Sequence, residues 1–106
     1  MSSNDISSTT TKWNVIVTRA VKKQIQKLDK SVYAALLLLM EDLAQYGPAA
    51  GGTWKNYGKL KGLGSDKRHC HLIKGRPTYV CCWEVVNNTL KIIEVYYAGT
   101  HEKAPY

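Results

Sequence analysis

The chain has 106 residues, of which 44% are hydrophobic, and this content suits one domain with one core but not two. Its formal net charge is +7, from fifteen lysines and arginines against eight aspartates and glutamates, which favours an anionic partner. The longest apolar stretch, residues 32–40, is too short to span a bilayer, so we expect no membrane association.

Residues 1–11 are rich in serine and threonine and contain no apolar run, so they resemble neither a signal peptide nor a membrane anchor. We predict a disordered N-terminal tail over 1–11 and a single domain over 12–106. The three cysteines are odd in number, and the adjacent Cys81 and Cys82 would point to opposite faces of a strand. A disulfide framework is therefore not expected, which fits the cytoplasm.

Two helices are expected to follow a first strand at residues 13–18. From residue 19 to 28, apolar side chains recur at helical spacing while lysines occupy the other side, which is typical of an amphipathic helix. Ser31 is a suitable N-cap for a second helix that ends at Tyr46, before Gly47 and Pro48. The two helices should form a hairpin.

Four consecutive leucines, residues 36–39, surround the second helix instead of forming one stripe. Either this helix is buried on several sides, or it offers apolar surface to a partner. The pattern favours core, and the interface interpretation stays open.

Residues 47–66 contain many glycines and are expected to be mostly loop, attached to the core by Trp54, Tyr57 and Leu60. Three strands should follow at 68–73, 78–86 and 90–97, joined by turns at 74–77 and 87–89. The expected order is β-α-α-β-β-β. This order predicts an α+β fold in which a helical hairpin packs on one face of a small, mainly antiparallel sheet and leaves the other face free.

Basic residues are concentrated in the segment 53–76, where Asp66 is the only acidic residue. This segment is either a solvated loop or a surface that binds RNA phosphates. Its candidate phosphate contacts are Lys55, Lys59, Lys61, Lys67, Arg68, His69 and Lys74, and Arg76 is expected to bind phosphate as part of the catalytic set.

Histidines and a phenol provide the candidate catalytic groups. His69 and His71 should share one face of a strand because side chains alternate, and His101, Glu102 and Tyr106 follow the last strand. Cleavage of RNA by the adjacent 2′-hydroxyl needs a base, an acid and cations that stabilise the phosphorane, and these residue types supply all three. Glu102 is either a catalytic carboxylate or a charge partner for its neighbours.

No motif in the sequence indicates a metal or cofactor site. Cys70 lies between two histidines, but metal-ligand spacings are absent and strand alternation would divide these side chains between two faces. No phosphate-binding loop, paired metal-binding carboxylates or nucleophile elbow is present. We therefore expect metal-free chemistry without a small-molecule cofactor.

The element order and several short segments resemble the RelE/ParE superfamily, the toxin halves of bacterial toxin–antitoxin pairs. The matching segments are 59–62 (KLKG), 69–72 (HCHL), 79–85 and 96–102 (YYAGTHE). The resemblance implies a RelE-like fold over about residues 13–106. It also implies a cognate antitoxin as partner, and either cleavage of mRNA in the ribosomal A site, as in RelE-like members, or poisoning of DNA gyrase, as in ParE-like members.

Position by position, His69 and His71 fall where RelE has two functional lysines, while His101 and Tyr106 fall near its C-terminal functional arginine and tyrosine. The RelE arginine on the next strand aligns with Val80, which leaves Arg76 as a substitute. A C-terminal histidine is similar to the HigB and YoeB branch, so the resemblance favours a ribosome-dependent endoribonuclease. A non-catalytic binding protein, either a gyrase poison or a passive RNA-binding domain, is the alternative.

Overall fold

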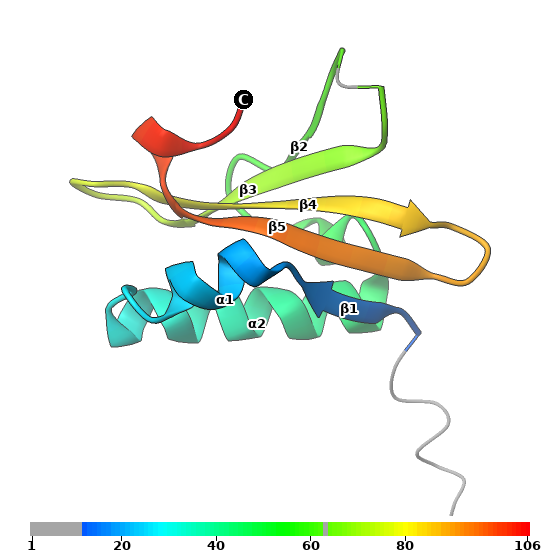
Figure 1. The fold of residues 1–106 in the computed structure, drawn as a ribbon, viewed down its shortest axis with the longest axis horizontal. Coiled ribbons are helices and arrows are strands. Elements are labelled where there is room, and N and C mark those ends of the chain that lie inside the picture. Colours follow the sequence, from blue (N-terminus) through cyan, green and yellow to red (C-terminus); the bar gives the residue numbers. More distant parts are fainter. Residues whose placement is uncertain (1–11, 63) are drawn as a thin grey trace, which may run out of the picture.

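A five-stranded mixed sheet with two helices on one face forms the body of the protein (Figure 1). The computed structural model describes residues 12–62 and 64–106, so the tail predicted at 1–11 lies outside the described residues. The strands lie in the order β1-β5-β4-β3-β2, in which β1 is parallel to β5 and every other neighbouring pair is antiparallel. The predicted α+β class, with its mainly antiparallel sheet, is confirmed.

The elements follow the predicted order with three additions, a short strand before the long hairpins and two 3₁₀ helices. In chain order they are β1 (Asn14–Val17), α1 (Arg19–Ile25), α2 (Lys30–Tyr46), the 3₁₀ helix η2 (Ala50–Gly52), β2 (Gly58–Leu60), β3 (Lys67–Ile73), β4 (Tyr79–Asn87), β5 (Ile92–Thr100) and the 3₁₀ helix η3 (His101–Lys103).

Local caps and buried stripes explain the two helices. The hydroxyl of Thr18 accepts a hydrogen bond from the amide of Val21 at 3.2 Å and caps α1. Helix α2 begins at Lys30 with Asp29 at its N-cap, so the prediction of Ser31 as the cap is wrong. None of the described helices is long and apolar enough to cross a membrane.

The leucine run of α2 divides evenly between core and surface. Leu36 and Leu39 are fully buried, whereas Leu37 and Leu38 are 45% and 59% exposed. With Val32 and Leu43, the buried pair forms a stripe at helical spacing that packs against the sheet. The run therefore serves the core and also leaves apolar surface, so neither interpretation excludes the other.

The segment 47–66, expected to be mostly loop, contributes an extra edge strand. Strand β2 pairs with β3 through Gly58 opposite His69 and Leu60 opposite Lys67. It has only three residues and begins with glycine, so it carries too little alternation to be recognised in sequence. Trp54 and Tyr57 pack against the core as expected, whereas Leu60 is not among the residues that pack against it.

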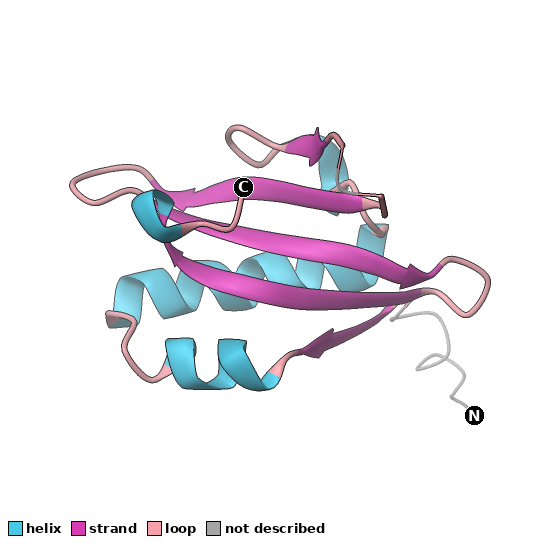
Figure 2. Cartoon of the chain, turned by 45° about the horizontal axis from the view of Figure 1, so that its top comes forward, coloured by secondary structure: helices cyan, strands magenta, loops and turns pink. Residues whose placement is uncertain are grey.

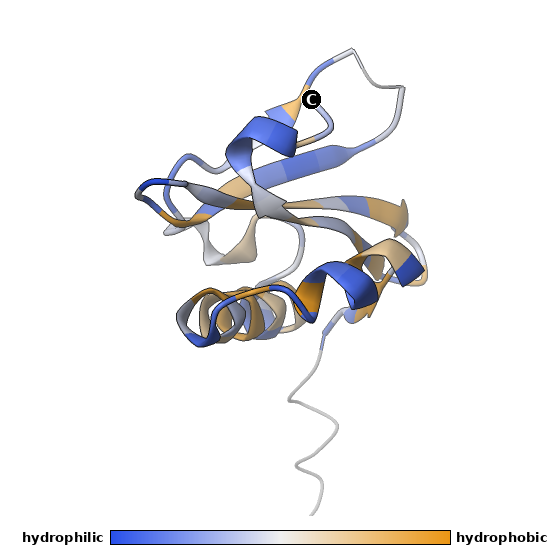
Figure 3. Ribbon diagram, turned by 60° about the vertical axis from the view of Figure 1, so that its left-hand side comes forward, coloured by the Kyte–Doolittle hydropathy of each residue, from blue (hydrophilic) through white to orange (hydrophobic). Residues whose placement is uncertain are grey.

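Alternation along the strands separates a helix-facing core from an open face. Cys70, Cys81 and Trp83 belong to the core under the helices, while Val80, Cys82 and Tyr97 form a small cluster on the opposite face. The open face comes forward in Figure 2, where η3 and the C-terminus lie in front of the strands. Figure 3 shows that this side of the sheet carries many hydrophilic segments.

A β-bulge in β5 places two consecutive tyrosines near this open face. Cys82 pairs with Tyr97 and Trp83 pairs with Val95, so Tyr96 has no partner in the register. Consequently, Tyr97 belongs to the small cluster and Tyr96 packs against it.

The leucine pair provides a direct test of the packing. We expect Leu39→Ala to lower the free energy of unfolding by about 2–5 kcal/mol, because it removes a fully buried side chain and leaves a cavity. Leu38→Ala, the adjacent exposed leucine, should change it by no more than about 0.5 kcal/mol. Urea denaturation followed by circular dichroism measures both, and equal losses would contradict the assigned orientation of α2.

Candidate active site on the open face of the sheet

Three histidines and a tyrosine gather on the open face. The ring of His69 lies 4.9 Å from that of Tyr106, and the ring of His71 lies 5.7 Å from that of His101. The rings of His101 and Tyr106 are 6.0 Å apart. We call these four residues the histidine cluster.

Strand β3 positions two members of the cluster, and the C-terminal segment positions the other two. Cys70 and Leu72 point into the core, which sends His69 and His71 to the open face. The amide of His101 donates to the carbonyl oxygen of Thr78 at 2.8 Å, which holds the start of η3 beside the β3–β4 turn. The segment beyond η3 folds back over the sheet, so that Tyr106 reaches His69.

A cavity of about 600 Å³ lies beside the cluster, and four of the five residues predicted as catalytic line it. These are His71, Arg76, His101 and Glu102, joined by Gly75, Pro77 and Thr78. Tyr106, the fifth of these residues, belongs to the histidine cluster but does not line this cavity. We call the 600 Å³ cavity the catalytic cavity, after the predicted catalytic residues that line it.

A smaller cavity of about 360 Å³ also has His71 in its lining. Its lining residues are Lys55, Asn56, His71, Leu72 and Lys74. His71 is common to both linings, so the two cavities adjoin at this residue.

Burial and mutual repulsion keep two of the imidazoles neutral. The pKa of His69 is lowered by burial and by the positive charges of His71 and His101. The pKa of His71 is lowered by burial, by His101 and by Lys74. A neutral imidazole accepts a proton, so the lowered pKa favours proton transfer at these positions, and phosphate binding by His69 stays a prediction.

Tyr106 and the cysteines are held in their protonated forms. Burial raises the pKa of the Tyr106 phenol, which therefore remains a proton donor at neutral pH. All three cysteines are free and buried, and burial raises the pKa of Cys70 and of Cys82 to about 12. Within 12–62 and 64–106, no group of three histidine, cysteine, aspartate or glutamate side chains is arranged to hold a metal ion.

The predicted phosphate contacts are divided between the cavity linings and other positions on the chain. Lys55, Lys74 and Arg76 line the cavities, whereas Lys59 lies on β2 and Lys61 follows it. The ammonium of Lys67 lies 5.4 Å from the centre of the Tyr96 ring.

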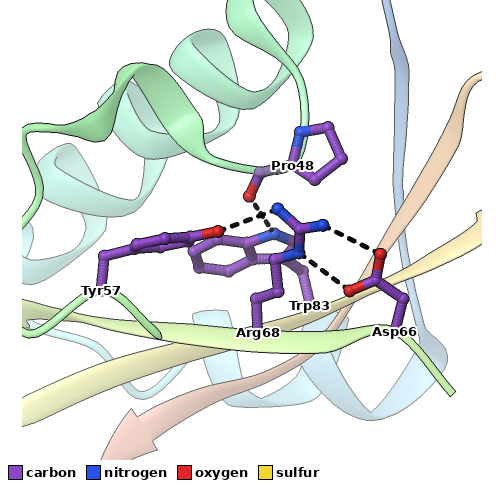
Figure 4. Close-up of polar contacts among 5 residues, drawn as sticks. All are labelled: Pro48, Tyr57, Asp66, Arg68 and Trp83. Atoms are coloured by element: carbon purple, nitrogen blue, oxygen red, sulfur yellow. Dashed lines mark hydrogen bonds and ion pairs between the residues drawn. The ribbon is translucent and has the colours of Figure 1, made fainter. Parts of the chain in front are cut away.

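Arg68 alternates with His69 along β3 and so lies on the opposite face from the cluster. There it takes part in a structural clamp (Figure 4). Its guanidinium forms two hydrogen bonds of 2.9 Å with Asp66 and one of 2.8 Å with the phenol of Tyr57. The Tyr57 ring stacks on Trp83, whose indole N–H donates to the carbonyl oxygen of Pro48 at 3.0 Å. With a side chain only 13% exposed, Arg68 holds the segment before β2 against β3 and β4, and it does not join the cavities.

Sequence patterns did not identify Thr78 and Asn56 as parts of the site. The Thr78 hydroxyl accepts from the amide of Gly75 and donates to its carbonyl oxygen, which shapes the turn that carries Arg76. A threonine three residues after a glycine at a turn is the one signal that indicates this role. Asn56 resembles an ordinary turn residue in sequence, and only the fold places it beside His71.

No protein-family model and no curated protein matches the chain. Among solved structures, it is similar to the archaeal RelE–RelB complex from Pyrococcus horikoshii OT3, with a TM-score of 0.63 and 25% sequence identity. The match covers 87% of this chain and 98% of the archaeal chain. The chain has a RelE-like toxin fold. In this RelE-like fold, the histidine cluster lies on the sheet face that the helices leave open.

Titration by NMR tests the electrostatics of the cluster. We expect His69 and His71 to titrate below the usual histidine pKa of about 6.5. His101→Gln should raise the pKa of both, because it removes a positive charge that acts on each. Lys74→Gln should raise only that of His71. A pKa for His71 above 6.5 in the unaltered protein would contradict the assigned burial.

Proposed function

We propose that this chain is the toxin of a toxin–antitoxin pair and a metal-independent, ribosome-dependent endoribonuclease that cleaves messenger RNA in the ribosomal A site. It would act in the cytoplasm, where its substrate lies. The observation that carries the proposal is the convergence of His71, His101 and Arg76 on one open cavity, with Tyr106 beside the histidines. These groups match the base, the acid and the cation that RNA cleavage needs.

The reaction is a transfer within the RNA chain. The 2′-oxygen of one nucleotide attacks the adjacent phosphorus, the bond from phosphorus to the 5′-oxygen breaks, and a 2′,3′-cyclic phosphate and a 5′-hydroxyl result. His71 takes the proton from the 2′-hydroxyl, because its lowered pKa leaves the imidazole free to accept. His101, which lines the same cavity, donates a proton to the leaving 5′-oxygen.

The remaining groups bind and orient the phosphate. The guanidinium of Arg76 always carries its charge and can make two parallel contacts to phosphate oxygens, so it stabilises the phosphorane. Tyr106 stacks on a base or orients the phosphate, and Glu102 keeps its two alternatives of catalytic carboxylate and charge partner. Lys59, Lys61 and Lys67 lie outside the cavities and would contact ribosomal RNA.

A cognate antitoxin is the proposed protein partner. The archaeal protein of similar fold was solved in a complex with RelB, and we extend that pairing to this chain. Helix α1 carries Lys22 and Lys23 next to α2, which exposes Leu37 and Leu38 (Figure 1). An amphipathic antitoxin helix with acidic residues along its edge would complement this surface.

Primer extension on a defined mRNA tests the activity. With ribosomes, the unaltered protein should produce discrete cuts, and without ribosomes it should produce none. His71→Gln and His101→Gln should each reduce the cleavage rate by about 10²–10⁴-fold, the usual contribution of a general acid or base. Both variants should retain the thermal unfolding midpoint of the unaltered protein. Intact mRNA in every lane would contradict the proposal, and blocked DNA replication with unchanged translation would indicate a gyrase poison.

Loss of Arg76 should reduce the cleavage rate more than loss of a positive charge outside the cavities. Arg76→Ala should reduce cleavage by roughly 10²–10³-fold, because it removes a charge-stabilising donor from the reaction centre. Lys23→Ala removes the same charge from α1, on the far side of the sheet, and should change the rate by no more than about two-fold. Single-turnover rates on programmed ribosomes measure both, and equal losses would show that Arg76 acts only through net charge.

A further inference from the structure

The smaller cavity beside His71 is built from a tight turn and from the part of β3 that extends past β2. Strand β2 pairs with β3 only as far as His69. Past that point, the amide of His71 donates to the carbonyl oxygen of Lys55 at 2.8 Å. This bond fixes the turn at 54–57 against β3 and opens the cavity between Lys55 and Lys74.

Asn56 occupies a constrained position in this turn. Its φ of 52° lies in the left-handed region, which asparagine tolerates better than most residues. The turn is held on both sides, since the Trp54 indole donates to Asp42 at 2.8 Å and the Tyr57 ring stacks on Trp83. Asn56 is exposed, and none of the hydrogen bonds among the described residues involves its amide. The turn explains the backbone conformation of Asn56. Its exposed side-chain amide can therefore bind a ligand at the cavity rim.

The lining of this cavity has the chemistry of a nucleotide site. Lys55 and Lys74 supply positive charge for phosphate, and Leu72 and the His71 ring supply an apolar edge and a flat face for a base. Asn56 supplies one donor and one acceptor, the pair that matches the exposed edge of adenine. A volume of about 360 Å³ is at the lower end of the usual range for small-ligand pockets.

We propose that this cavity binds the nucleobase next to the scissile phosphate and that Asn56 reads its edge, which makes Asn56 a specificity-determining residue. The inference rests on the proposed ribonuclease function, because His71 connects this cavity to the catalytic cavity. A nucleotide whose phosphate lies at Arg76 and His101 then has its neighbouring base beside His71 and Asn56. Adenine is the base favoured there.

Sequencing of cleavage ends on ribosomes that carry a pool of mRNAs with randomised codons tests this inference. The unaltered protein should prefer adenine at one position next to the cut. Asn56→Gly fits the left-handed backbone and removes the amide, so it should lower that preference by at least about five-fold while cleavage persists. Asn56→Asp has almost the same shape but only acceptors, so it should shift the preference toward cytosine, whose amino group donates. Asn88→Gly, in the remote β4–β5 turn, is the matched control.

The outcomes separate this inference from the proposed function. Cleavage by the unaltered protein with the same base profile in both Asn56 variants would overturn the role of Asn56 and leave the ribonuclease intact. A change of profile in Asn88→Gly as large as in Asn56→Gly would also overturn it. No cleavage by the unaltered protein would overturn the proposed function, and the inference with it.

Discussion

The register of β3 is the constraint on which both the core and the candidate site depend. This strand sends Cys70 and Leu72 under the helices and His69 and His71 onto the open face. Because side chains alternate with period two, a slip of one residue would bury the imidazoles and expose the core residues. Pairing with β4 on one side and with β2 on the other opposes such a slip.

The clamp around Arg68 adds to this constraint from the helix side. The guanidinium of Arg68 donates hydrogen bonds to Asp66, which precedes β3, and to Tyr57, which precedes β2. Because Tyr57 also stacks on the buried Trp83 of β4, the clamp connects three strands through side chains. A paired, mostly buried guanidinium is costly to leave without partners, so loss of Asp66 would strain the part of the sheet that carries the histidines. The most basic segment of the chain thus contains one cation that maintains the fold and others that face the cavities.

Sequence reasoning predicted the layers, the helical hairpin and the shared face of His69 and His71, because each depends on periodicity over several residues. It did not predict β2, whose three residues become a strand only through pairing with β3. It also grouped Arg68 with the phosphate-binding residues, since a count of charges does not show that Asp66, two residues away, captures the guanidinium. The proximity of Tyr106 to His69 arises from an irregular C-terminal segment that has no periodic signal.

Val80 aligns with the arginine that RelE carries on its third strand, and on this open face the positive charge lies in the neighbouring turn, on Arg76. Val80 pairs with His71 in the sheet and is fully buried in the small cluster with Cys82 and Tyr97. A charged side chain there would lose its hydration beneath the C-terminal segment, at a large cost in free energy. Arg76 avoids that cost, because it lies in the exposed turn and still reaches the cavity lined by His71 and His101. In the proposed mechanism, proton transfer belongs to His71 and His101 and charge stabilisation belongs to the exposed guanidinium of Arg76, so the two tasks lie on different side chains of one cavity. This arrangement also makes the position of Arg76 depend on the turn that Thr78 shapes and not on the rigid strand beside it.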